Sequence, residues 1–170
     1  MGYIYYYNLY YTTFTILGWR KILTDQKNID VIVDAFTFIT QQKKCIIYAF
    51  VIMPNHIHVV YQTLDPYTDG KVKHSFLSHT AKKLLENCGS LSPAIKEEFL
   101  VEKSNKKYQI WKSPSLSVDL ISPKFVSQKI NYIHDNPRRA DLVLNNEDYK
   151  YCSWKSYVNG ESEFEFLTLW

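Results

Sequence analysis

The stretch Tyr48-Ala49-Phe50-Val51-Ile52-Met53-Pro54-Asn55-His56-Ile57-His58-Val59-Val60-Tyr61 joins two hydrophobic runs through Met-Pro-Asn. Runs of this kind around a Pro-Asn break predict two strands connected by a tight turn. His56 and His58 are two residues apart, so we expect both side chains on one face of the second strand and Ile57 on the other. Their backbone positions should lie roughly 6–7 Å apart, which suits two imidazoles binding one divalent cation. Taken alone, the His-x-His spacing more often marks two histidines on a half-exposed strand face.

The elements around this stretch predict the fold. Hydrophobic patterns predict strands at residues 5–16, 45–53, 56–62 and 108–111. Helical spacing predicts helices at residues 30–43, 74–87, 92–101 and 122–135, with a loop at residues 64–73. The order strand, helix, two strands, helix, strand indicates an α+β protein with a ferredoxin-like antiparallel sheet and helices packed on one face. We expect a single domain over residues 1–170.

Composition narrows the class of protein. The chain has 170 residues, of which 46% are hydrophobic, and this is enough material for a core. It has no apolar run of about 18 residues and no secretory signal pattern, so we expect no membrane partner. The three cysteines, Cys45, Cys88 and Cys152, form no Cys-x-x-Cys pair. We therefore expect reduced thiols and a cytoplasmic location.

Basic residues are concentrated in the middle of the chain. Residues 101–140 contain eight lysines and arginines against three acidic residues, whereas the last thirty residues are acidic. A charge run most often covers a solvated face, but a basic block is also where a phosphate backbone could lie. The residues that we single out as candidate nucleic-acid contacts are Arg138, Arg139, Lys82, Lys83, Lys106 and Lys107.

The helix expected from Ser122 has a second face that the core does not need. Val126, Ile130 and Ile133 form an apolar stripe, while Lys129, Tyr132 and Asn136 follow one another at steps of three or four. The carboxamide oxygen of Asn136 can bind a metal ion. Tyr132 and Asn136 are therefore expected side by side over a cation held by His56 and His58. His134 points away from this face and receives no catalytic role.

Two motifs together resemble a known family. Met53-Pro54-Asn55-His56-Ile57-His58, followed about 75 residues later by Tyr132-Ile133-His134-Asp135-Asn136-Pro137, resembles the REP-associated tyrosine transposases of the HUH endonuclease superfamily. The similarity extends over most of the chain. Asp141 departs from the pattern, because relatives usually have glycine there, and this leaves the geometry of the turn after the helix open.

The resemblance implies roles for individual residues. It implies that His56, His58 and Asn136 bind Mg²⁺ or Mn²⁺ and that Tyr132 is the nucleophile. It also implies a single-stranded, hairpin-forming DNA as the partner. The ferredoxin-like fold that the family implies agrees with the order of elements.

The residue types support the same chemistry. Two neutral imidazoles and an amide leave a bound cation its full charge to stabilise a phosphodiester transition state. Neither motif places a carboxylate where it could activate water. Tyr132 can instead attack phosphorus and form a 5′-phosphotyrosine, which preserves the energy of the bond for rejoining DNA. Lys129, one helical turn away, could assist loss of the phenol proton.

Two other function classes remain compatible with the sequence. One is a catalytically inactive hairpin-binding protein of the same fold, which would need no metal. The other is a metal-dependent hydrolase, against which the lack of carboxylate ligands counts. Incubation with labelled single-stranded DNA and Mn²⁺ separates the three classes. The transposase forms a covalent adduct, the hydrolase releases free cleaved DNA, and the binding protein gives no reaction.

Overall fold

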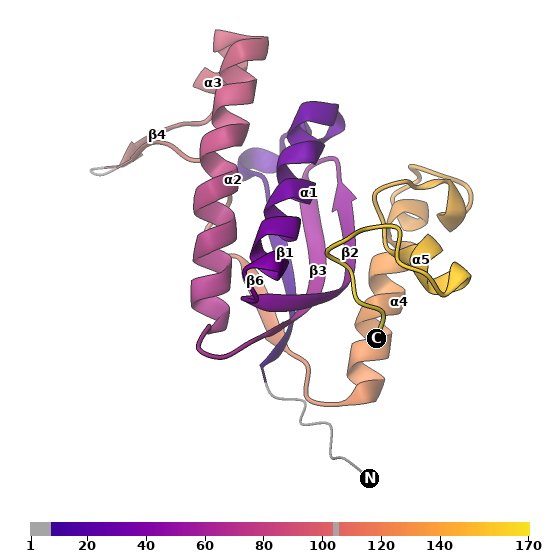
Figure 1. The fold of residues 1–170 in the computed structure, drawn as a ribbon. Helices are drawn as coiled ribbons and strands as arrows, with labels where there is room; N and C mark the ends of the chain where they lie inside the picture. Colours follow the sequence, from indigo (N-terminus) through magenta and orange to yellow (C-terminus); the bar gives the residue numbers. More distant parts are fainter. Residues whose placement is uncertain (1–7, 104–105) are drawn as a thin grey trace.

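A four-stranded antiparallel sheet lies at the centre of the computed structural model, which describes residues 8–103 and 106–170 (Figure 1). The strands lie in the order β2-β3-β1-β6, and α1 and α2 connect β1 to β2 and β3 to β6. This is the βαββαβ order of a ferredoxin-like fold, so the predicted α+β class is confirmed. These elements are β1 (Leu9–Thr15), α1 (Gln26–Gln41), β2 (Cys45–Met53), β3 (His56–Thr63), α2 (Asp69–Leu91) and β6 (Leu116–Asp119).

The helices lie on both faces of the sheet, which differs from the prediction that they all pack on one face. Helices α1 and α2 cover one face, and α4 (Pro123–Arg139) packs against the other (Figure 1). The physical reason is visible in the strands, whose residues are apolar on both faces. Phe50 and Ile52 face α1, whereas Val51 and Met53 face α4. A sheet that is hydrophobic on both sides requires a cover on both sides.

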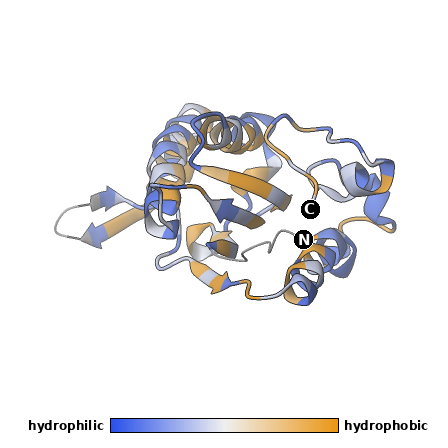
Figure 2. Cartoon of the chain, turned by 60° about the horizontal axis from the view of Figure 1, so that its bottom comes forward, coloured by the Kyte–Doolittle hydropathy of each residue, from blue (hydrophilic) through white to orange (hydrophobic). Residues whose placement is uncertain are grey.

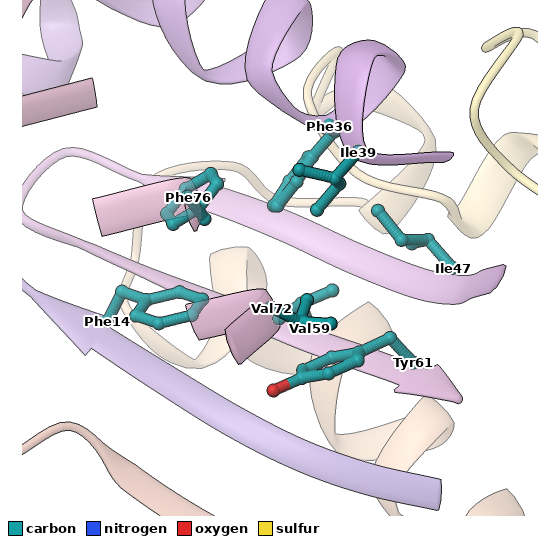
Figure 3. Close-up of a pocket in the computed structure, with 8 residues that line it drawn as sticks. All are labelled: Phe14, Phe36, Ile39, Ile47, Val59, Tyr61, Val72 and Phe76. Carbon is teal, nitrogen blue, oxygen red and sulfur yellow. The ribbon is translucent and has the colours of Figure 1, made fainter. Parts of the chain in front are cut away.

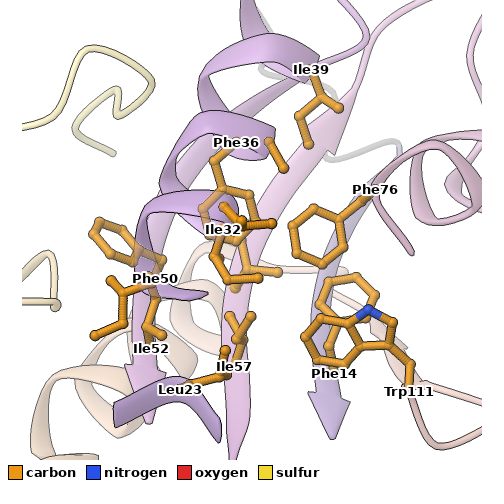
Figure 4. Close-up of a cluster of buried hydrophobic side chains, with 14 of the residues drawn as sticks. Phe14, Leu23, Ile32, Phe36, Ile39, Phe50, Ile52, Ile57, Phe76 and Trp111 are labelled. Carbon is orange, nitrogen blue, oxygen red and sulfur yellow. The ribbon is translucent and has the colours of Figure 1, made fainter. Parts of the chain in front are cut away.

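The larger core lies between the sheet and the pair α1 and α2. Phe36 from α1 stacks on Phe76 from α2, with ring centroids 5.1 Å apart, and Phe14 from β1 lies 4.7 Å from Phe76 (Figure 4). A cavity of about 10 Å³ lies in this core, and Figure 3 shows the residues that line it. It is lined almost entirely by apolar groups, so it is a packing gap of the core and not a ligand site.

The second core is smaller and holds α4 in place. Val126, Ile130 and Ile133 are buried against Val51 and Val60 of the sheet. This is the apolar stripe predicted from the sequence. The central strands of the sheet are coloured as hydrophobic in Figure 2. The stripe fixes the rotation of α4 about its axis, and hence the direction of its remaining side chains.

Helix α2 is longer than predicted at both ends. It starts at Asp69, after Thr68, whose side chain accepts a hydrogen bond from the Lys71 backbone N–H, and it runs to Leu91. The predicted loop is therefore helical from Asp69, and Gly89 does not end the helix. Gly89 instead allows close approach of the chain that follows, since a Cβ there would lie 3.0 Å from the Lys96 side chain. The next helix, α3 (Pro93–Glu97), is shorter than predicted.

The fourth strand of the sheet is not the one predicted. Residues 108–111 contribute only Tyr108 to β5 (Lys106–Tyr108), which pairs with β4 (Leu100–Lys103) in a separate hairpin. The place next to β1 is taken by β6, a short and half-exposed edge strand. Its alternating Leu-Ser-Val-Asp sequence is too short and polar to stand out as a strand.

Helix α4 begins where predicted and ends later. Ser122 caps it by accepting a hydrogen bond from the Phe125 backbone N–H at 3.2 Å. The helix then continues through Pro137 to Arg139. Proline cannot donate to the carbonyl of Ile133, four residues earlier. The Cys152 thiol lies 4.0 Å from that oxygen and supplies a weak donor, which helps the helix to tolerate Pro137.

The remaining elements are short. No helix in the described part of the chain is long and apolar enough to cross a membrane. The short elements are η1 (Leu17–Trp19), η2 (Ile22–Thr24), η3 (Asn146–Asp148) and α5 (Trp154–Asn159).

The turn after α4 keeps the left-handed geometry that glycine favours. Asp141 has φ +54°, and its N–H donates to the Arg138 carbonyl while the Leu142 N–H donates to the Pro137 carbonyl, both at 3.0 Å. These are the two hydrogen bonds of a Schellman cap. Asp141 therefore occupies the left-handed position of this cap, which glycine adopts without steric cost.

We predict that Asp141→Gly raises the free energy of unfolding by about 0.5–1 kcal/mol, because glycine adopts positive φ without steric cost. Asp141→Val should lower it, since a β-branched residue fits this region poorly. Urea unfolding of both variants measures the difference. Equal stability of the two variants would contradict the left-handed assignment.

Candidate functional site

His56 and His58 lie on the sheet face that α4 covers. Their ring centroids are 4.7 Å apart, whereas Ile57 between them is buried in the core under α1 and α2. This is the alternation predicted for a strand. Antiparallel pairing sets Thr13 opposite His58 and Thr15 opposite His56, so β1 forms one wall of the site.

His58 is buried and held by two hydroxyl groups. Its Nδ1 lies 2.8 Å from the Tyr11 hydroxyl and 2.9 Å from the Thr13 hydroxyl. Burial is the main cause that lowers the pKa of His58 to about 3, and the neighbouring His56 and Lys129 lower it further. The ring is therefore neutral at physiological pH, as a metal ligand must be. With Nδ1 engaged by the hydroxyls, Nε2 is the nitrogen that remains for a ligand.

His56 contacts two asparagines. Its Nδ1 lies 2.7 Å from the Asn55 side-chain oxygen. Burial lowers the pKa of His56, and a hydrogen bond with the Asn136 side chain partly opposes that shift. Helix α4 thus brings the carboxamide of Asn136 to His56.

Tyr132 and Lys129 complete the cluster. The Tyr132 ring lies 5.5 Å from the His58 ring and 6.2 Å from the Tyr11 ring. Tyr132 is 37% exposed, so its hydroxyl group is not sealed in the core. The Lys129 Nζ lies 4.6 Å from the Tyr11 ring centroid and 5.8 Å from that of Tyr132. We call His56, His58, Lys129, Tyr132 and Asn136 the histidine–tyrosine site.

The donors at this site fit a hard or borderline divalent cation. Two imidazole nitrogens and one amide oxygen are ligands that Mn²⁺ accepts, and Mg²⁺ accepts the oxygen with water in its other positions. Three protein ligands leave open positions for phosphate oxygens. Among the described residues, no group of three or more His, Cys, Asp or Glu side chains could hold a metal ion. Because two imidazoles and one amide are neutral donors, a cation bound by them would keep its positive charge.

The predicted DNA contacts are divided among three places. Arg139 is exposed next to the site, with its Cζ 5.4 Å from the Tyr132 ring centroid, whereas Arg138 forms an ion pair with Asp135 at 2.7 Å. Lys82 and Lys83 are exposed on α2, which covers the opposite face of the sheet.

The third place is the β4–β5 hairpin, which projects beside α2 in Figure 1, on the other side of the molecule from α4. It carries Lys107, which is exposed. The side chain of Lys106 lies outside the described part of the structure. Of the six basic residues, Arg138 and Arg139 are thus on the same helix as Tyr132.

Sequence reasoning missed three residues at the site. Tyr11 and Thr13 hold His58, and the exposed Trp19 ring lies 5.9 Å from the His56 ring. The alternation of β1 could have placed Tyr11 and Thr13 on one face. Only the pairing of β1 with β3 shows that His58 lies on the same face of the sheet as these two residues.

The fold and the site together define a ferredoxin-like domain with paired histidines on one strand and a tyrosine on a covering helix. No protein-family model and no curated protein matches the sequence. Solved structures share the fold. One is a REP-associated tyrosine transposase bound to a REP hairpin, with a TM-score of 0.66, 16% identity, and coverage of 95% of this chain and 91% of that chain.

Another similar structure is a protein from Deinococcus radiodurans R1 described as a candidate transposase. It has a TM-score of 0.50 and 17% identity, with coverage of 79% of this chain and 95% of that chain. At these identities the likeness establishes a shared fold. It supports, at the level of fold, the resemblance that the two motifs indicate.

Helix α4 is anchored on its other side by a buried polar contact. His134 Nε2 lies 2.9 Å from the Ser153 hydroxyl, which also accepts a hydrogen bond from the Phe50 backbone N–H. Burial lowers the pKa of His134 to about 4.

A pKa that is lower in the folded than in the unfolded chain makes stability depend on pH. We predict that the free energy of unfolding falls as the pH drops from 6.5 towards about 4, because the unfolded His134 takes up a proton that the folded ring resists. The slope contributed by this residue is up to about 1.4 kcal/mol per pH unit. His134→Gln should flatten the pH dependence in urea unfolding, and His79→Gln, which changes an exposed residue, is the control. An unchanged slope in His134→Gln would contradict the prediction.

Proposed function

We propose that this protein is a metal-dependent single-stranded DNA transposase or endonuclease that cleaves and rejoins DNA through a 5′-phosphotyrosine on Tyr132. The observation that carries the proposal is that α4 brings Tyr132 and Asn136 to the face of β3 that holds both histidines, with the Tyr132 and His58 rings 5.5 Å apart. The proposed nucleophile and the proposed cation ligands thus lie close together although they are distant in the sequence.

The proposed site uses Mg²⁺ or Mn²⁺ held by His56, His58 and Asn136. When bound, the cation would stabilise the negative charge that develops on the non-bridging phosphate oxygens. Tyr11 and Thr13 keep the His58 ring oriented, as the outer hydrogen bonds of metal-binding histidines commonly do. Neutral histidines are the form that can bind a cation.

Tyr132 supplies the attacking oxygen. Its phenol oxygen forms a bond to phosphorus while the bond from phosphorus to the 3′ oxygen breaks, and that oxygen leaves with a proton as a free 3′-hydroxyl. Lys129 stands beside the ring, so its positive charge stabilises the phenolate as the proton is lost. Attack by a 3′-hydroxyl on the phosphotyrosine reverses the step and joins a strand.

The partner that we propose is hairpin-forming single-stranded DNA. The structural neighbour bound to a REP hairpin supports this choice, since it shares the fold over most of both chains. Arg139 next to Tyr132 is placed to meet a phosphate. All three cysteines are free and buried, which supports a reducing, cytoplasmic location.

The nucleophile is tested by Tyr132→Phe. The change removes one oxygen and keeps the ring, so we expect the fold and DNA binding to remain and the covalent adduct to vanish. The assay is a denaturing gel of labelled single-stranded DNA after incubation with Mn²⁺, followed by peptide mapping of the adduct. Tyr151→Phe is a matched control that should still form the adduct. Attachment of DNA to another tyrosine would refute the assignment, and cleavage without any adduct would indicate a hydrolase.

The cation site is tested by His58→Ala and His56→Ala. Each removes one ligand, so Mn²⁺-dependent cleavage should fall by at least about 100-fold. Calorimetric titration with Mn²⁺ should show the same loss in binding, independent of activity. His79→Ala, which changes an exposed histidine on α2 that does not line the groove beside this helix, is the control. Cleavage at the wild-type rate by either site variant would show that the pair has only a structural role.

A further inference from the structure

A large groove lies between α2 and the segment that leads from β5 to β6. Its volume is about 920 Å³, and it is lined on one side by α2 residues such as Lys73 and His74 and on the other by residues 108–115. None of these lining residues is acidic, and two of them are lysines, of which Lys73 forms an ion pair with Asp69. Tyr108 at its wall has the Lys96 and Lys107 Nζ atoms 5.2 and 5.6 Å from its ring centroid. The groove thus combines positive charge, hydroxyl groups and an aromatic ring.

Backbone hydrogen bonds tie this groove to the histidine–tyrosine site. The Lys112 N–H donates to the Thr15 carbonyl at 2.8 Å, and Thr15 is paired with His56 in the sheet. The Leu17 N–H donates to the Ile110 carbonyl at 2.7 Å. The wall of the groove therefore runs beside the end of β1, one strand away from His56.

Trp19 lies between the groove and the histidine–tyrosine site. Its ring is 54% exposed, it lies 5.9 Å from the His56 ring, and the Lys112 Nζ lies 5.9 Å from its centroid. The backbone of Trp19 has φ +56°, a region that bulky residues rarely adopt. The Asn55 side chain donates to the Trp19 carbonyl at 3.3 Å and helps to hold this conformation. An exposed indole kept at a costly backbone angle, next to candidate metal ligands, has no packing explanation.

We propose that single-stranded DNA leaves the histidine–tyrosine site across Trp19 and Lys112 and enters the groove beside α2. Trp19 is the platform on which a base next to the scissile phosphate stacks, and Lys112 contacts the following phosphate. This inference rests on the proposed function and adds to it the path of the strand. Interleaved aromatic rings and lysines are what sequence-independent binding of single strands requires, since every base has a π-face and every linkage a charge.

The same features argue against two simpler explanations, namely that Trp19 is a core residue and that Lys112 serves only in an ion pair. A core tryptophan would be covered, and Trp19 is not. Lys112 has no ion-pair partner among the salt bridges of the described residues, so its charge remains for a phosphate. The groove also continues from Trp19, because Lys112 belongs both to its lining and to the surroundings of Trp19.

Binding without cleavage tests the platform. The probe is a fluorescein-labelled oligothymidine of about 20 nucleotides, with EDTA present so that no strand is cut, and fluorescence anisotropy gives the dissociation constant. Trp19→Ala should weaken binding by about 5- to 150-fold, the effect of losing one base–aromatic stack. Trp19→Phe keeps a ring and should lose much less. Trp170→Ala, which removes a 39% exposed indole that packs on Tyr48 of β2, should bind like the wild type.

The lysine is tested by the salt dependence of the same binding. Lys112→Gln should reduce the slope of log K against log salt by about 0.7, the value for one phosphate contact on a single strand. Lys43→Gln is the control, because Lys43 is exposed at the opposite end of β2 from the turn that leads to His56. Wild-type affinity in a folded Trp19→Ala, an unchanged slope in Lys112→Gln, or no binding of the oligothymidine by the wild type would each overturn the proposed path.

The two proposals can fail separately. If Tyr132→Phe loses the adduct while Trp19→Ala binds normally, the chemistry stands and the strand follows another route. If Trp19→Ala binds weakly while Tyr132→Phe still forms an adduct, the path stands and the nucleophile is wrong. Thermal unfolding of each variant shows whether a loss of binding reflects a loss of fold.

Discussion

The site depends on one constraint, which is the antiparallel pairing of β3 between β1 and β2. This register sets Thr13 opposite His58 and Thr15 opposite His56, and it brings Tyr11 close enough to bind His58 Nδ1. A shift of one residue would exchange the two faces of β3. The histidines would then face the core under α1 and α2, and Ile57 would face α4. Burial of Ile57 therefore holds the histidines in position, since the exchange would expose an apolar side chain and bury two imidazoles among apolar groups.

The same sheet is hydrophobic on its second face, and this is what positions Tyr132, the proposed nucleophile. The apolar stripe of α4 packs on Val51 and Val60. The neighbouring face of the helix, which carries Tyr132 and Asn136, is therefore turned towards the histidines. The last turn of α4 carries Asn136 and must pass through Pro137 to reach the Schellman cap at Asp141. The weak donor of Cys152 and the contact between His134 and Ser153 stabilise this end of the helix. Residues remote from the chemistry thus fix the position of Asn136.

The electrostatics of the site follow from this burial. A half-covered cluster under a helix lowers the pKa values of both histidines, with desolvation as the first cause, and keeps the rings neutral. Lys129 stands close enough to contribute to the shift of His58 and to face Tyr132. Neutral rings are the form that the proposed cation requires. The charged side chains beside the Tyr132 ring, Lys129 and Arg139, are both basic, which suits the anionic partner that we propose.

The sequence by itself determined the local features of this protein. Alternation at His56, Ile57 and His58, the stripe of the last helix and the spacing from Tyr132 to Asn136 depend on strand and helix periods, which short stretches encode. The βαββαβ order also followed from local patterns. Only the tertiary structure decided which face α4 covers, that β6 and not residues 108–111 completes the sheet, and that Tyr11, Thr13 and Trp19 surround the histidines. Those outcomes depend on register and on contacts between residues more than forty positions apart in some cases, such as Tyr11 with His58. The periods of single strands and helices do not encode these contacts, because they form only when α1 and α2 pack on one face of the sheet and α4 packs on the other.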